Sequence, residues 1–184
     1  MCKKRSANEL WATYHVTSGT AKRLYQNLDN AEGTHTAVWP TTATNSLITI
    51  GTAGDVNDNA GTYVMWCWHS VDGYSKIGTY TGNNNANGPF VYTGFRPAYL
   101  MVRETGNANY FIVRDSVRDG YNPDTPYTFA TTNGVEYSGS GAYELDLLSN
   151  GFKVRNTGSG TNTSNGNYLY IAFAEFPFKY TNAR

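Results

Sequence analysis

The sequence predicts an all-β protein, an antiparallel β-sandwich built from two tandem related units. Two observations predict this class: a composition dominated by strand and turn residues, and an internal repeat. Tyr occurs 15 times and Gly 19 times in the 184 residues, while charged residues make up only 15%. Tyr and Thr fit a half-buried pleated surface, and Asn and Gly tolerate the positive φ angles of tight turns. No window shows a sustained helical period of apolar residues, so we expect no long helix.

The repeat relates two segments of equal length. Residues 46–68 align with residues 151–173 without a gap, and each segment reads as a strand, a polar Asn/Gly loop and a long apolar strand. The matched positions carry similar side chains: Leu47 with Phe152, Asn57 with Asn162, Gly61 with Gly166, Tyr63 with Tyr168, and Trp68 with Phe173. The chain is therefore expected to contain two copies of one unit.

The starts of the two copies also align, at a different offset. Residues 1–3 align with residues 101–103. The change of offset predicts roughly five additional residues in the middle of the second copy, at the turn-forming residues 122–126 or 138–141.

The two copies differ in how they begin. We expect the first unit at residues 1–75 and the second, complete unit at residues 76–184. Two candidate strands, residues 76–80 and 90–92, precede the matched region of the second unit, and nothing ahead of Met1 corresponds to them. The first unit is therefore expected either to lack its initial strands or to receive them from a partner, because an unpaired sheet edge invites another chain.

Short apolar segments between turn signals give the predicted strands. They are residues 10–15, 22–27, 47–50, 63–70, 76–80, 90–92, 98–104, 110–115, 127–131, 144–146, 152–155 and 168–175. Residues 63–68 and 168–173 are apolar on both alternating faces, which is typical of a central strand buried on two sides. The predicted structural core residues in these two strands are Trp66, Trp68, Ile171 and Phe173.

Composition excludes several function classes. The formal net charge is +0, so no basic excess favours nucleic acid, and the short run Lys3 to Arg5 is expected to be solvated or paired. No stretch is long and apolar enough for membrane insertion, and no apolar region of a secretory signal follows Met1. Cys2 and Cys67 lack metal-ligand spacing, and Cys67 is expected to be buried. These features predict folding in a reducing cytoplasm.

Four segments carry a resemblance to a known family. They are GYSKIGTYTGN at residues 73–83, GPFVYTGFRP at 88–97, SNGFK at 149–153 and YIAFAEFPF at 170–178. Together they resemble an uncharacterised repeat family found near the C-termini of phage and prophage virion proteins. The resemblance implies a non-enzymatic structural component of a bacteriophage virion surface, made in the host cytoplasm, as a fibre, tail or capsid decoration protein. It implies no catalytic residues and no cofactor.

Partners follow from the same resemblance and from the unequal starts. We expect a homo-oligomer in contact with other virion proteins, with a trimer favoured because phage fibres are commonly trimeric. The alternative is that the first unit covers its own edge with residues 17–20 or 41–45.

One loop is close to a calcium-binding pattern. Asp55, Asn57 and Asp58 offer oxygen donors, but Trp66 stands at the twelfth position, where an EF-hand loop needs Glu. The matching residues 161–166 keep the turn chemistry without a carboxylate, so a turn is preferred and calcium remains the weaker hypothesis.

No constellation predicts an enzyme. His15, His35 and His69 show no ligand spacing, and residues 138–141 lack the glycine of a nucleophile elbow. Carboxylates that a glycoside hydrolase would need are Asp115, Asp119, Glu144 and Asp146. A polysaccharide hydrolase is kept only as a third hypothesis.

The second hypothesis is a carbohydrate-binding, receptor-recognition module of a phage tail fibre. Aromatic faces pack on sugar rings and a few polar groups orient them. The aromatic residues with the best prospect of exposure are Trp39, Tyr74, Tyr80 and Tyr121.

Overall fold

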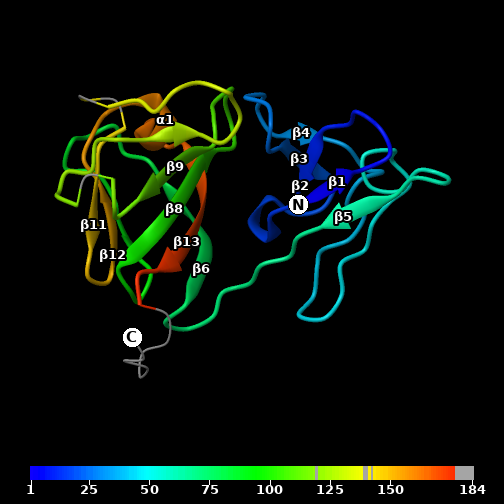
Figure 1. The fold of residues 1–184 in the computed structure, drawn as a ribbon, viewed down its shortest axis with the longest axis horizontal. Helices are drawn as coiled ribbons and strands as arrows, with labels where there is room; N and C mark the ends of the chain where they lie inside the picture. Colours follow the sequence, from blue (N-terminus) through cyan, green and yellow to red (C-terminus); the bar gives the residue numbers. More distant parts are fainter. Residues whose placement is uncertain (119, 139–140, 142, 177–184) are drawn as a thin grey trace. The chain divides into compact units, whose positions relative to one another are not determined.

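The computed structural model describes residues 1–118, 120–138, 141 and 143–176. Their regular secondary structure is almost entirely antiparallel β-sheet, and the chain divides into two compact units, Met1–Cys67 and Trp68–Arg184 (Figure 1). The repeat alignment placed the boundary after residue 75. Residues 69–71 bond to the start of the next strand, since Val71 N–H donates to Ser75 O (3.0 Å) and Ser75 Oγ donates to His69 O (2.8 Å). This turn therefore groups with the second unit.

The first unit contains one five-stranded sheet in the order β4-β3-β2-β1-β5. Its elements are β1 (Cys2–Lys4), β2 (Trp11–Thr13), a 3-10 turn (Val16–Ser18), β3 (Lys22–Tyr25), β4 (Gly33–Thr34) and β5 (Tyr63–Met65). The core is small and consists of five buried residues: Cys2, Ala12, Val38, Trp39 and Val56. Strand β5 lies at the edge of the sheet.

The predicted central strand at residues 63–70 is much shorter than expected. β5 ends at Met65 and pairs only with β1 among the described residues, so the chain beyond it has no neighbouring strand. Trp66 and Trp68 are consequently 38% and 42% exposed and lie outside the core. Cys67 is exposed as well. An apolar run is buried on both faces only when strands flank it, and here one side has none.

The predicted strand at residues 47–50 does not form. Leu47 is 62% exposed, whereas its repeat equivalent Phe152 is fully buried. Phe152 lies in a strand with neighbours on both sides, and residues 46–50 have neither neighbour.

The second unit contains two sheets, of order β10-β9-β8-β13-β6 and β11-β12-β7. Its elements are β6 (Ser75–Thr81), β7 (Phe90–Tyr92), β8 (Pro97–Glu104), β9 (Ile112–Asp115), β10 (Thr128–Phe129), β11 (Leu145–Leu148), β12 (Gly151–Val154), α1 (Ser159–Asn162) and β13 (Asn167–Ala174). One buried cluster draws side chains from both sheets: Val91, Phe95, Leu100, Val102, Leu145, Leu147, Phe152, Val154, Tyr168, Tyr170 and Ala172.

β13 is an interior strand of the five-stranded sheet, between β8 and the edge strand β6. Tyr168, Tyr170 and Ala172 enter the buried cluster. Ile171 and Phe173 were predicted as core residues, but they lie on the other face and are only half-buried. Successive side chains of a strand point to opposite faces, and the larger cluster lies on the face of the two tyrosines.

The two five-stranded sheets share a pairing register. In the first, Lys4 lies opposite Tyr63 and Cys2 lies opposite both Met65 and Ala12. In the second, Glu104 lies opposite Tyr168 and Val102 lies opposite both Tyr170 and Ile112. The residues of the first sheet correspond to those of the second at the two offsets of the repeat alignment, 100 positions for Cys2, Lys4 and Ala12 and 105 positions for Tyr63 and Met65.

Candidate functional site

The four aromatic residues predicted to contact glycans do not gather in one place. Trp39 is 2% exposed and packs in the core against Tyr14, so it offers no surface. Tyr80 is half-buried and stacks on Tyr168. Tyr74 and Tyr121 are exposed, at 40% and 82%. No ring contact joins any two of the four within the described residues, so they do not form a shared platform.

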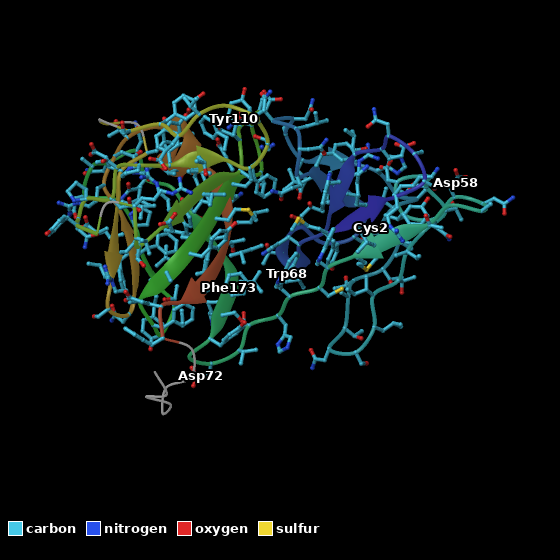
Figure 2. The ribbon with its side chains drawn as sticks, viewed as in Figure 1. Cys2, Asp58, Trp68, Asp72, Tyr110 and Phe173 are labelled. Carbon is cyan, nitrogen blue, oxygen red and sulfur yellow. The ribbon has the colours of Figure 1, made fainter. Side chains whose placement is uncertain are left out.

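A different set of rings does gather, in the second unit. We call it the aromatic cluster, and its members are Tyr110, Tyr127, Phe129, Tyr137 and Tyr143. The ring centroids of Tyr110 and Phe129 lie 4.6 Å apart, and those of Tyr127 and Tyr143 lie 4.8 Å apart. Tyr137 is 41% exposed and the other four are half-buried. Tyr110, labelled in Figure 2, comes from the segment just before β9.

Local backbone pairing builds the cluster. Tyr127 and Tyr137 exchange two backbone hydrogen bonds of 2.9 Å across an antiparallel bridge, which sets their rings face to face with centroids 5.4 Å apart. Phe129 follows two residues after Tyr127, so both side chains leave the same face of the strand. A Cβ atom at Gly160 in α1 would overlap the ring of Tyr143, so glycine there lets this ring approach.

A buried arginine, Arg114, packs against the aromatic cluster and bonds to the backbone that carries it. Arg114 is fully buried, and its guanidinium donates hydrogen bonds to the carbonyls of Asp124 (2.9 Å), Pro126 (2.8 Å) and Tyr143. The same group lies 5.0 Å from the ring centroid of Tyr127. Burial lowers the pKa of Arg114 from its ordinary value, and the charge of Asp124 opposes that shift. Arg114 thus links the backbone at Asp124, Pro126 and Tyr143, close to the rings of the aromatic cluster.

The hydroxyl groups of the cluster are available. Those of Tyr110, Tyr127, Tyr137 and Tyr143 make no hydrogen bond to any residue that the structure describes. A phenol is protonated at neutral pH, and burial raises the pKa of Tyr127 and of Tyr143 further above its ordinary value of 10.0. Half-exposed rings with free O–H groups can stack on an apolar ligand face and donate hydrogen bonds at its rim.

Sequence reasoning missed the aromatic cluster. The spacing of Tyr127 and Phe129 places them on one face of a strand, and this was a usable signal. The contribution of Tyr110, Tyr137 and Tyr143 depends on chain pairing that no local pattern reveals.

The three residues considered as calcium ligands, Asp55, Asn57 and Asp58, each bond to different protein groups. Asp55 accepts from Arg23 (2.7 Å) and from the hydroxyl of Tyr25 (3.0 Å). Asp58 pairs with Lys4 at 2.6 Å, and the Asn57 amide donates to Gly51 O. Among the residues that the structure describes, no group of three or more His, Cys, Asp or Glu side chains could hold a metal ion.

The candidate catalytic carboxylates are also dispersed. Asp115 pairs with Arg118 (2.6 Å), Asp146 pairs with Arg155 (3.4 Å), and Glu144 accepts from Gly141 N–H (2.8 Å). Asp119 lies outside the described residues. No helix in the described part of the chain is long and apolar enough to cross a membrane.

Comparison with models of known protein families gave a match over most of the chain. A family model described as a domain of unknown function, DUF7483, matches residues 1–177, and the chain belongs to this family. A search of curated proteins and a search of solved structures gave no significant match.

Proposed function

We propose that this protein is a non-enzymatic structural component of a bacteriophage virion surface, in a fibre, a tail or a capsid decoration. The phage assignment comes from the resemblance of its Gly/Tyr/Thr motifs to virion repeat proteins. The structural role is supported by one observation: β1 pairs with β5 in the same register in which β8 pairs with β13, as expected if one β-framework is repeated along the chain. Repetition of one unit extends a scaffold, which suits a component that coats or projects from a surface.

Side-chain bonds support the proposal that the units are copies. The hydroxyl of Tyr63 accepts from Asp58 N–H (2.7 Å) and donates to Gly54 O (2.6 Å). The hydroxyl of Tyr168 accepts from Thr163 N–H (2.7 Å) and donates to Ser159 O (2.6 Å). Each loop also has one non-glycine residue with φ 57°, Ala60 in the first and Asn165 in the second. All four pairs of positions are matched by the same gapless alignment.

The finer architecture belongs to the proposal as well. We infer that the complete unit is a β-sandwich, because its buried cluster is lined by Leu100 and Tyr170 of the five-stranded sheet and by Phe152 of the three-stranded sheet. The two inner faces of a sandwich share one core in this way.

The test of the virion role is direct detection. We expect mass spectrometry of density-purified particles, from the organism that encodes the chain, to find this protein at a stoichiometry comparable with other particle proteins. Its absence from such particles, while it is present in the lysate, would contradict the proposal.

A second candidate function rests on the aromatic cluster. Its five rings and free hydroxyls suit the apolar face and the hydroxyl rim of a sugar, which supports a carbohydrate-binding, receptor-recognition module. We expect Tyr137→Ala to abolish binding to any glycan that the native chain retains on an array. Tyr92→Ala is the matched control, since Tyr92 is 63% exposed and belongs to no ring contact of the cluster. Equal loss in both variants, or no glycan bound at all, would count against this function.

A further inference from the structure

The first unit has an open strand edge, formed by the outer side of β5. On the inner side, Arg5 N–H donates to Thr62 O (2.7 Å) and Trp66 N–H donates to Met1 O (2.9 Å). Residues along an antiparallel strand alternate in the side to which they bond. The N–H and C=O groups of Tyr63 and Met65 therefore face away from β1, and no described residue bonds to them. Neither residues 17–20 nor residues 41–45 cover this edge with backbone hydrogen bonds.

The second unit shows what occupies the equivalent edge. β6 pairs along β13, with Tyr80 opposite Tyr168 and Gly78 opposite Tyr170. The ring of Tyr80 stacks on that of Tyr168 with centroids 4.9 Å apart, and its hydroxyl donates to Thr161 O (2.8 Å). Tyr63, the equivalent of Tyr168, has no such ring partner within the described residues.

Asn57 and Asn162, which the repeat alignment matches, differ in the same way. The Asn162 amide donates to Asn156 O (2.6 Å) inside its own loop and to Asn85 O (2.8 Å) in the loop between β6 and β7. Its Oδ1 atom accepts from Asn83 N–H (2.8 Å). Asn57, its repeat equivalent, makes a single side-chain hydrogen bond to the residues that the structure describes, which its amide donates to Gly51 O (3.0 Å) within its own loop. Asn57 is exposed, whereas Asn162 is fully buried.

Glycines define the kind of segment that fits. A Cβ atom at Gly78 would lie 2.9 Å from the hydroxyl of Tyr170, and one at Gly88 would lie 2.6 Å from Val154 O. A Cβ atom at Gly82 would overlap Thr163 O. Backbone atoms cannot move aside for a side chain, so the segment must carry glycine where it crosses the loop and the second sheet.

The exposed apolar residues of the first unit fit the same occupant. Leu47, Ile48 and Ile50 are 62%, 37% and 39% exposed. In the second unit, Phe152 lies opposite Val91 of β7 and is fully buried. A strand of the β7 type would cover the equivalent Leu47.

We propose that the first unit accepts, along β5, a segment of the β6-to-β7 type carried by a different polypeptide of the same family and not by a second copy of this chain, whose own residues 75–81 already pair with β13. The segment adds a strand beside Tyr63 and Met65, and its loop backbone bonds to Asn57. This inference rests on the proposed relationship between the two units and specifies how the structural component would assemble. Strand addition to an exposed edge is a common mode of recognition, in which main-chain bonds supply affinity and side-chain pockets supply specificity.

The probe is a synthetic peptide with the sequence of residues 75–92 of this chain, added to the full-length protein. We expect saturable binding with one peptide per chain, measured by fluorescence anisotropy. Hydrogen exchange at Tyr63 and Met65 should slow by at least tenfold on binding, because their amides become bonded. Exchange in β13 should not change.

Variants of the peptide and of the protein test whether the binding is specific to the β5 edge. A peptide with Gly82→Val should not bind, because its side chain meets loop backbone. In the protein, Met65→Pro removes an outward N–H and should weaken binding at least tenfold without loss of the β1 pairing. Asn57→Ala should also weaken binding, while the control Asn59→Ala, at another exposed position of the same loop, should not.

Two results would overturn the proposal. One is no change in exchange at β5 at saturating peptide, or a change confined to β13, which would mean that the peptide displaces β6 of the second unit. The other is protection of β5 in the chain alone together with concentration-dependent dimers in sedimentation, because the occupant is then a second copy. Absence of the protein from particles would refute the virion role and leave the peptide result unaffected.

Discussion

At the scale of single residues, Tyr63 and Tyr168 have the clearest structural role, because each hydroxyl bonds to the loop that precedes its strand. Each hydroxyl satisfies one backbone N–H and one carbonyl in the loop ahead of its strand. Tyr63 is half-buried and Tyr168 is fully buried. Removal of either hydroxyl leaves one backbone N–H and one carbonyl without their partner, and the cost in stability rises with the burial of these two groups.

The first prediction concerns these hydroxyls. Tyr168→Phe should lower the free energy of unfolding by about 1–3 kcal/mol, since Thr163 N–H and Ser159 O lose their partner. Tyr63→Phe should lower it by less, because water can reach that loop. Urea unfolding followed by circular dichroism measures both changes. An equal or larger effect at Tyr63 would contradict the assignment.

A pH dependence follows from His15, which is 7% exposed in the first unit. Burial lowers the pKa of His15 below its ordinary value of 6.5. The folded state therefore binds a proton less readily than the unfolded state, so stability is highest above pH 6.5 and falls as the pH drops toward the folded pKa. In the variant His15→Gln, the unfolding midpoint should change less between pH 7 and pH 5 than it does in the native chain. An unchanged slope in the variant would show that other groups cause the dependence.

At the scale of elements, the neighbours of a strand decide what its apolar residues do. β13 has a strand on each side and buries Tyr168 and Tyr170, whereas β5 has one neighbour, and the corresponding residues Tyr63 and Met65 are half-buried and 37% exposed. The same pattern of side chains is core in one sheet and surface in the other. The cost of removing a side chain should follow this difference.

The third prediction contrasts two aromatic residues. Phe152→Ala should cost about 3–5 kcal/mol, because the ring is fully buried between Tyr80 and Tyr170. Trp68→Ala should cost less than about 1 kcal/mol, because Trp68 is 42% exposed and outside either core. Chemical denaturation of both variants gives the comparison. A large loss from Trp68→Ala would restore the sequence-based expectation that this strand is central.

At the scale of the whole molecule, the two units are unequal. Among the described residues, the first has a single sheet and a core of five buried residues, and the second has two sheets, both of which contribute to a cluster of eleven buried residues. Stability rises with the apolar area that a unit buries, so the small unit should be the weaker one.

The fourth prediction is an order of unfolding. Residues 1–67 should lose hydrogen-exchange protection at lower urea than residues 68–176, because the first unit buries less apolar surface. Mass-spectrometric exchange at graded urea concentrations measures this order. A single transition in which both units lose protection together would contradict it.

The sequence by itself determined the all-β class, the lack of a long helix among the described residues, and the pairs of positions that have the same strand register in the two sheets. Local composition and a gapless alignment contain this information, because turn residues and alternation act over a few residues. It did not reveal that Trp66 and Trp68 are surface residues, that residues 47–50 form no strand, or that five distant rings meet in the aromatic cluster. Those outcomes depend on which strands lie beside one another, and an apolar residue becomes core only where a neighbouring strand covers it.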